Sequence, residues 1–159
     1  MIGVIGVEKK LKLVLSKYPG TSEALTHIMD AIAYSRIKQM SPQFLVADIN
    51  RSIDFYTDKL GFDIDFRYED FYAGIIKDGF SIHLKSGQPS IEERKNKRNN
   101  EDLDVVFSVD GIEDLYRGLA DKFVKFTQPL RKMPYGKEFY VADPDGYIIS
   151  FLEEAKSSL

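Results

Sequence analysis

The sequence has 159 residues and contains neither cysteine nor tryptophan. Without cysteine, the chain has no disulfide framework, no thiolate-based zinc or iron–sulfur site and no thiol nucleophile. No stretch approaches the roughly 18 uninterrupted apolar residues that a membrane-spanning helix needs. The apolar start, residues 1–7, runs directly into Glu8, Lys9 and Lys10 without the hydrophobic region or cleavage site of a signal peptide. These absences favour a cytoplasmic protein with no membrane partner.

An excess of basic residues is also missing. The chain has 22 Lys and Arg against 25 Asp and Glu, a formal net charge of −3, and the acidic excess falls within residues 41–159. Because an acidic protein repels phosphate backbones, nucleic acid is not an expected partner. The hydrophobic content of 43% is enough for the core of one domain.

Residues 1–40 have apolar side chains at helical spacing. The pattern falls into two runs, 7–18 and 25–37, which predicts a helical hairpin that precedes the main domain. Pro42 forces the residue before it into an extended conformation. The second helix is therefore expected to end near Met40.

Two later stretches repeat one helical pattern. Apolar residues stand 3, 7 and 10 positions after Val46 and again 3, 7 and 10 positions after Val109. Asp110 with Glu113 resembles a capping box at the start of the second of these helices. Each helix follows the first strand of a group of short β runs, so the same unit is present twice.

The β runs are short and bounded by turn residues. Asp78-Gly79 and the Asp-Pro-Asp-Gly sequence at 143–146 are turns that close hairpins. The predicted strands are 43–47, 62–68, 72–77, 80–85, 103–109, 124–127, 137–142 and 147–152. The sequence therefore predicts an α+β domain of two tandem βαβββ units over residues 41–155, followed by a tail at 156–159.

Residues 86–102 contain almost no apolar side chains, and we interpret them as a solvated linker between the two units. The alternative is a nucleic-acid patch formed by Arg94, Lys95, Lys97 and Arg98. Acidic residues flank this group on both sides, which favours the linker.

Three stretches of the main domain resemble one protein family. Residues 55–62 are Phe-Tyr-Thr-Asp-Lys-Leu-Gly-Phe, residues 69–74 are Glu-Asp-Phe-Tyr-Ala-Gly, and residues 134–139 are Pro-Tyr-Gly-Lys-Glu-Phe. With the turn at 143–147, they are similar to motifs of the vicinal oxygen chelate superfamily, which includes glyoxalase I, fosfomycin-inactivating enzymes and bleomycin resistance proteins. The bleomycin resistance branch is the most similar. Across residues 41–155, the resemblance implies the glyoxalase/bleomycin resistance fold with a curved mixed sheet, and a homodimer whose paired units build two grooves.

The resemblance also bears on ligands. Tyr135 stands where the bleomycin resistance branch has a tryptophan that stacks on the ligand, so an aromatic platform is kept while bleomycin itself is less favoured. In metal-using members of the superfamily, four ligand positions correspond by motif register to Ser41, His83, Asp104 and Ser150. Neutral hydroxyls are poor ligands for a divalent transition metal. We therefore expect no metal and no other cofactor.

Alternation along the predicted strands gives one apolar face and one more polar face that suggests a groove. We interpret His83 on the polar face as a neutral hydrogen-bonding contact to a ligand rather than a general base. Asp104 either binds a cationic ligand or pairs with Lys85. Aromatic side chains that border the groove suit planar, cationic or heteroaromatic ligands. The residues assigned to ligand binding are Phe66, Tyr68, Tyr72, His83, Asp104, Tyr135 and Phe139.

Three functions remain open at this point. The favoured one is a non-catalytic, dimeric protein that sequesters an antibiotic-type small molecule with planar or cationic aromatic character. The second is a divalent-metal-dependent lyase, isomerase or dioxygenase of the same superfamily with an atypical ligand set, based on His83 and Asp104. The third is an interaction module with a vestigial groove, whose residues 1–40 bind a protein partner. No Gly-rich phosphate loop and no Gly-x-Ser-x-Gly elbow are present, so no catalytic residue is assigned.

Overall fold

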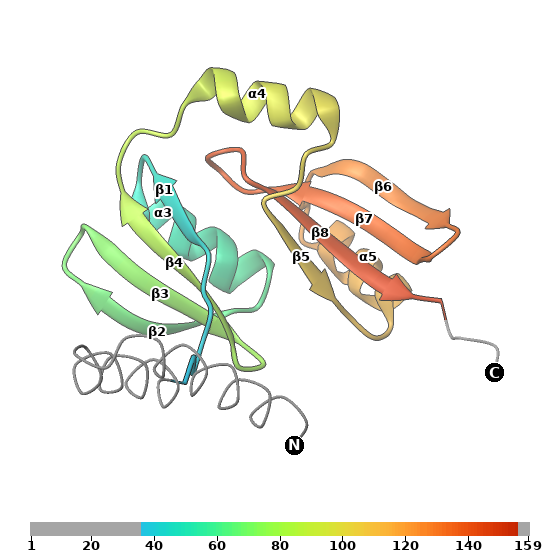
Figure 1. Ribbon diagram of the computed structural model, residues 1–159, viewed down its shortest axis with the longest axis horizontal. Helices are drawn as coiled ribbons and strands as arrows, with labels where there is room; N and C mark the ends of the chain where they lie inside the picture. The colour runs from blue at the N-terminus through green and yellow to red at the C-terminus, as the bar shows by residue number, and fades with distance from the viewer. Residues whose placement is uncertain (1–35, 156–159) are drawn as a thin grey trace, which may run out of the picture. The chain divides into compact units, whose positions relative to one another are not determined.

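The computed structural model of the protein describes residues 36–155 (Figure 1). The helical hairpin predicted at 1–40 lies outside this range except for its last five residues, and the tail predicted at 156–159 lies outside it entirely. These five residues form no helix, so the prediction that the second helix continues to Met40 is wrong. Ile37 is 93% exposed, and an apolar side chain left in water does nothing to stabilise a helix.

The first βαβββ unit is a four-stranded mixed sheet with a helix against one face. The strand order is β1-β4-β3-β2, in which β1 and β4 are parallel and the other neighbours are antiparallel. Asp78 and Gly79 form the β3–β4 turn as predicted, both with positive φ. The elements are β1 (Gln43–Val46), α3 (Ile49–Asp54), the π-helical turn η1 (Phe55–Lys59), β2 (Asp63–Tyr68), β3 (Tyr72–Lys77) and β4 (Phe80–Ser86).

The second unit repeats this arrangement in the order β5-β8-β7-β6, with β5 and β8 parallel. Figure 1 shows the two sheets, each with its own helix, in the blue-to-green and orange-to-red parts of the chain. The elements are β5 (Val105–Ser108), α5 (Ile112–Asp121), β6 (Phe126–Met133), β7 (Gly136–Ala142) and β8 (Ile148–Glu154). The predicted fold of two tandem βαβββ units is confirmed, and each unit forms its own sheet.

Strand β6 is longer than predicted because it continues past Pro129 to Met133. Proline cannot donate to a strand ladder, but it is tolerated at the edge of a sheet, and β6 is an edge strand. The register with β7 shifts between Gln128 and Arg131. The pairing of β6 with β7 is thus irregular at the proline and resumes after it, so Arg131 is part of the sheet.

The two helices begin differently. Asp48 caps α3, because its side chain accepts hydrogen bonds from two backbone N–H groups of the first turn. The capping box predicted from Asp110 and Glu113 does not form. Helix α5 follows Gly111, which has a left-handed backbone and no side-chain cap, and Glu113 pairs with Lys137 instead.

The turn between β7 and β8 fastens the second unit to the first. Tyr56 donates its hydroxyl hydrogen to Asp143 at 3.0 Å, and Arg51 pairs with Asp145 at 2.9 Å. The hydroxyl of Tyr147 accepts a hydrogen bond of 2.9 Å from a backbone N–H of β1. Burial raises the pKa of Asp143 to about 6, although hydrogen bonds to its carboxylate oppose this. Polar side chains therefore join the two units beside a shared apolar core.

The segment between the units is a helix, α4 (Ile91–Asn100), rather than the predicted solvated linker. None of its residues is fully buried, so hydrophobic periodicity could not reveal it. The guanidinium of Arg94 lies 4.2 Å from the ring centre of Tyr147 and pairs with Asp104 at 2.9 Å. Helical spacing places Lys97 on the same side of α4, where it also reaches Asp104. No helix within the described part of the chain is long and apolar enough to cross a membrane.

Candidate functional site

Four of the predicted ligand-binding residues come together on one face of the first sheet. Phe66 and Tyr68 belong to β2, Tyr72 to β3 and His83 to β4. The ring of Phe66 lies 5.7 Å from that of Tyr72 and 5.2 Å from that of His83. Tyr68 is 58% exposed, so part of this surface is open to a ligand. We call Phe66, Tyr68, Tyr72 and His83 the first wall.

Gly74 allows the ring of Phe66 to lie across β3. The two residues are cross-strand partners, and a Cβ atom at Gly74 would overlap that ring. Phe71, which was not assigned from the sequence, extends the aromatic surface because it stacks on Tyr72 with ring centres 6.4 Å apart. It lies in the turn between β2 and β3, where strand alternation does not tell which face a side chain takes.

A chain of hydrogen bonds runs through the first wall. Gln43 Nε2 donates to the hydroxyl of Tyr72 at 3.3 Å, and that hydroxyl lies 2.7 Å from Nδ1 of His83. The hydroxyl can accept from Gln43 and donate its own proton to Nδ1, and in that arrangement a neutral imidazole has its proton on Nε2. This geometry suits a hydrogen-bond donor to a ligand better than a general base.

The second sheet carries a polar cluster that includes one predicted residue. Tyr135, in the turn between β6 and β7, donates to Oε2 of Glu138 at 2.9 Å. Tyr140 and Arg131 donate to Oε1 of the same carboxylate at 2.7 and 2.9 Å. Glu101, just after α4, pairs with Arg131 at 2.7 Å. We call Glu101, Arg131, Tyr135, Glu138 and Tyr140 the second wall.

The hydrogen bonds of the second wall keep Glu138 ionised. Burial opposes the charge, but hydrogen bonds from Tyr140, Arg131 and Tyr135 outweigh it and hold the pKa of Glu138 below its ordinary value. Burial and the hydrogen bond to Glu138 raise the pKa of Tyr140 to about 12. The hydrogen bond to Glu138 also raises the pKa of Tyr135. Both phenols therefore stay protonated at neutral pH and act as donors.

Sequence reasoning missed Glu138 and Arg131 for different reasons. Glu138 lies within the motif at 134–139, but the resemblance implies a ligand contact only for the aromatic position of that motif. Arg131 lies beyond 127, where the predicted strand ended. The signal for both was their spacing on adjacent strands, which became visible only through their pairing in the β6–β7 ladder.

Phe139 lies in the core rather than in the groove. It has no exposed surface, and its ring centre lies 5.6 Å from that of Phe126 and 5.1 Å from that of Phe151. Side chains alternate along a strand, so Phe139 points to the face opposite Glu138 and Tyr140. The structure therefore removes Phe139 from the surface that can contact a ligand.

Asp104 is also enclosed within the protein. Its side chain is 6% exposed and pairs with Arg94 at 2.9 Å and Lys97 at 2.5 Å, while the backbone N–H of Ile148 donates to its second oxygen at 2.8 Å. Burial opposes ionisation, but these hydrogen bonds hold the pKa of Asp104 below its ordinary value. Lys85 is not its partner, and the carboxylate is neutralised by α4.

The four superfamily ligand positions do not make a metal centre. Ser41 is hydrogen-bonded to another serine, and Asp104 is held by two cations. The Oγ of Ser150 is buried without a hydrogen-bond partner in the described part of the chain. No group of three or more His, Cys, Asp or Glu among those residues is arranged to hold a metal ion. Two serines, a bound carboxylate and His83 do not fit a divalent transition metal.

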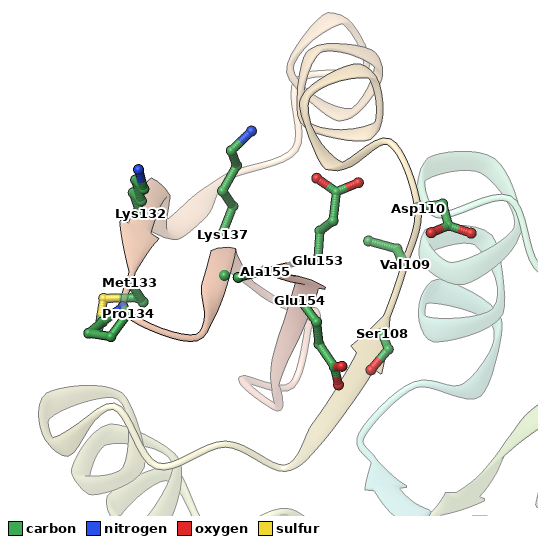
Figure 2. Close-up of a pocket in the computed structure, with 11 residues that line it drawn as sticks. Ser108, Val109, Asp110, Lys132, Met133, Pro134, Lys137, Glu153, Glu154 and Ala155 are labelled. Atoms are coloured by element: carbon green, nitrogen blue, oxygen red, sulfur yellow. The ribbon is translucent and has the colours of Figure 1, made fainter. Parts of the chain in front are cut away.

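A cavity of about 850 Å³ lies at one end of the second sheet, and no residue of the first wall lines it. Figure 2 shows Lys132 and Lys137 on one side of it and Glu153 and Glu154 on the other. Lys137 is paired with a glutamate of α5, and Glu153 accepts a hydrogen bond from the backbone N–H of Gly111 at 2.7 Å. Its mixed charges favour no single class of ligand.

Comparison with known proteins agrees with this architecture. A family model described as the Glyoxalase/Bleomycin resistance protein/Dioxygenase superfamily matches residues 25–151. The chain belongs to this superfamily. Within it, the bleomycin resistance protein of Geobacillus stearothermophilus is 30% identical over 133 residues, which cover 75% of this chain and 98% of that protein.

Two solved structures share the superfamily fold. UcmS2 has a TM-score of 0.61 and 24% sequence identity, with 76% of this chain and 100% of that chain covered. A bleomycin-binding protein from bleomycin-producing Streptomyces verticillus, complexed with copper(II)-bleomycin, has a TM-score of 0.56 and 20% identity, with 76% and 99% covered. The predicted glyoxalase/bleomycin resistance fold is confirmed.

Proposed function

We propose that the protein binds and sequesters an antibiotic-type small molecule with a planar or cationic aromatic part, and that it does not transform this ligand. The observation that carries the proposal is the first wall, where aromatic rings and an imidazole stand together on a partly exposed sheet face. The 30% identical bleomycin resistance protein supports an antibiotic as the class of ligand.

The chemistry of the first wall suits a flat ligand. Aromatic rings in offset or edge contact contribute about 0.5–1.5 kcal/mol per pair beyond their buried area, and a cation over such a ring contributes about 0.5–2 kcal/mol. Tyr68 and Phe71 present exposed ring surface, and Nε2 of His83 offers one directed hydrogen bond. Asp104 and Phe139 take no part because both are enclosed.

We infer further that a second copy of the chain completes the groove. Leu45 on the face of the first wall is 38% exposed, and Val106 on the face of the second wall is 49% exposed. Exposed apolar side chains beside a binding surface are typical of a face that another molecule covers. In a two-fold dimer, the first wall of one chain can oppose the second wall of its partner.

Calorimetric titration with metal-free bleomycin tests the function. We expect saturable binding near one ligand per chain. Tyr68→Ala should weaken binding about tenfold, since it removes one exposed ring from the stacking surface. Phe123→Ala is the matched control, because Phe123 is 89% exposed in the turn after α5, outside both walls.

Analytical ultracentrifugation tests the pairing of two chains. Val106→Glu places a charge on the exposed apolar face and should lower the fraction of dimer relative to the unmodified protein.

The absence of heat from the unmodified protein at tens of micromolar would reject bleomycin as the ligand. An equal loss of affinity in Tyr68→Ala and Phe123→Ala would reject the first wall as the binding surface. A monomer that binds with full affinity would reject the paired groove.

A further inference from the structure

Few contacts within residues 36–155 orient the exposed ring of Tyr135. The side chain is 50% exposed, and no other aromatic ring within residues 36–155 lies against it. The backbone of the turn is well held, because the N–H of Ala155 donates to the carbonyl of Tyr135 at 2.8 Å. At Gly136 the chain passes so close to β8 that a Cβ atom would overlap its backbone. The turn is therefore fixed, while the direction of the ring depends on its hydroxyl.

That hydroxyl ends on Glu138, and Glu138 is itself held on several sides. Its side chain is only 4% exposed. Tyr140, which is 5% exposed, and Arg131 both donate to Oε1, while Oε2 accepts the hydrogen bond from Tyr135. Nη2 of Arg131, which lies 2.8 Å from Oε1 of Glu138, also pairs with Glu101 at 2.7 Å. The carboxylate is thus a fixed acceptor rather than a mobile surface charge.

We propose that Glu138 is a positioning residue for ligand recognition, because its buried carboxylate holds the phenol of Tyr135 so that the ring presents one face to a planar ligand. This inference rests on the function proposed above. Holding the hydroxyl oxygen fixes the first side-chain torsion of Tyr135. A phenol O–H lies in the plane of its ring, so the direction of the hydrogen bond to Oε2 of Glu138 also sets the orientation of the ring plane. A ring that is ordered before the ligand arrives loses less conformational freedom on binding.

A double-mutant cycle on bleomycin binding tests this coupling. Tyr135→Phe keeps the ring and removes the anchor, whereas Glu138→Gln keeps the shape and weakens the acceptor. Each should weaken binding about fivefold, and the double variant should be no weaker than the worse single variant, because both changes break the same link. Glu113→Gln is the matched control, since it makes the same change at a carboxylate outside both walls, the α5 partner of Lys137, and should leave affinity within about twofold.

Additive losses in the double variant, or a loss in Glu113→Gln as large as in Glu138→Gln, would overturn the proposal, because either result would mean that the loss does not arise from the contact between Glu138 and Tyr135.

A second measurement needs no ligand. In protein labelled with 13C at the tyrosine Cζ, the resonance of Tyr135 is the one absent from Tyr135→Phe. Its titration should move to lower pH in Glu138→Gln, because the carboxylate no longer stabilises the protonated phenol, and it should not move in Glu113→Gln. If the unmodified protein does not bind bleomycin but this shift occurs, the proposed ligand is rejected and the positioning of Tyr135 stands. An unchanged titration overturns the positioning whether or not bleomycin binds.

Discussion

The two walls come from units with the same strand order, but they are built from different chemistry. The first wall consists of rings joined by neutral hydrogen bonds, with Tyr72 between Gln43 and His83. The second wall is organised around the buried carboxylate of Glu138 and the cation of Arg131. The repeated topology sets where the strands run, while the side chains on the outer face of each sheet are free to differ. The first unit therefore supplies an exposed aromatic surface, and the second supplies a charged surface whose side chains are held by hydrogen bonds.

Removing a buried charge from the second unit should have the largest effect. Asp104→Ala leaves Arg94 and Lys97 together without their shared counter-ion, which should lower the free energy of unfolding by about 3 kcal/mol. His83→Ala in the first wall removes a half-buried neutral hydrogen bond and should cost about 1 kcal/mol. Urea unfolding followed by circular dichroism, at one protein concentration, measures both. Equal losses would contradict the contrast between the two units.

The first wall should respond in affinity more than in stability. Gly74→Ala pushes the ring of Phe66 away from β3 and breaks up the aromatic surface, so bleomycin binding should weaken about tenfold. The half-exposed ring can move toward solvent, which limits the loss of stability to about 1 kcal/mol. Gly118→Ala, a change in α5 with no atom within 4 Å of the added Cβ, is the matched control. If Gly74→Ala binds normally, Phe66 is not part of the ligand surface.

The smallest predicted effect is on the pH dependence of stability, to which Asp143 contributes with the opposite sign to Asp104 and Glu138. The pKa of Asp143 is raised to about 6, so its protonation stabilises the folded state, and this contribution is lost as the pH rises through 6. The pKa values of Asp104 and Glu138 are lowered in the folded state. Their carboxylates therefore stabilise the folded state at a pH above the unfolded-state pKa, and this stabilisation is lost as the pH falls through the folded-state pKa.

Acidification from pH 7 to 5 should therefore raise the free energy of unfolding by about 1 kcal/mol, followed by a fall below about pH 4. Urea unfolding across this range measures the change. Asp143→Asn should abolish the rise between pH 7 and 5 and keep the acid fall. A rise that persists in this variant would assign the effect to another group.

Much of the fold could be predicted because burial leaves a period in the sequence. Strand β1 has alternately exposed and buried residues, and the apolar ladder after Val109 matches α5. Helix α4 was not predicted because it buries no apolar stripe. It is held by charged side chains such as Arg94, and a pattern of charges does not distinguish a docked helix from a solvated linker. The second half of strand β6 was not predicted because a proline such as Pro129 normally argues against a strand.

The candidate site was predictable only in part, for a related reason. Phe66, Tyr68, Tyr72 and His83 meet because neighbouring strands bring them together. The turn at Asp78-Gly79 predicted the register of the β3–β4 hairpin, whereas the β2–β3 pairing contains a register shift that the sequence did not reveal. Residue type alone could not show whether the carboxylate of Asp104 is available to a ligand. Its neutralisation by Arg94 and Lys97 depends on how α4 packs, which no local sequence pattern reveals.

The fastening of the two units has a consequence for how the chain could be made. Tyr56 with Asp143, Arg51 with Asp145 and the shared core hold the units through side chains, independently of the peptide that connects them. A polypeptide cut in the short stretch between β4 and α4, at residues 87–90, should therefore give two complementary fragments that reassemble when mixed. Each wall could then be varied in its own fragment and combined with the other, which makes this protein a modular scaffold as well as a single gene product.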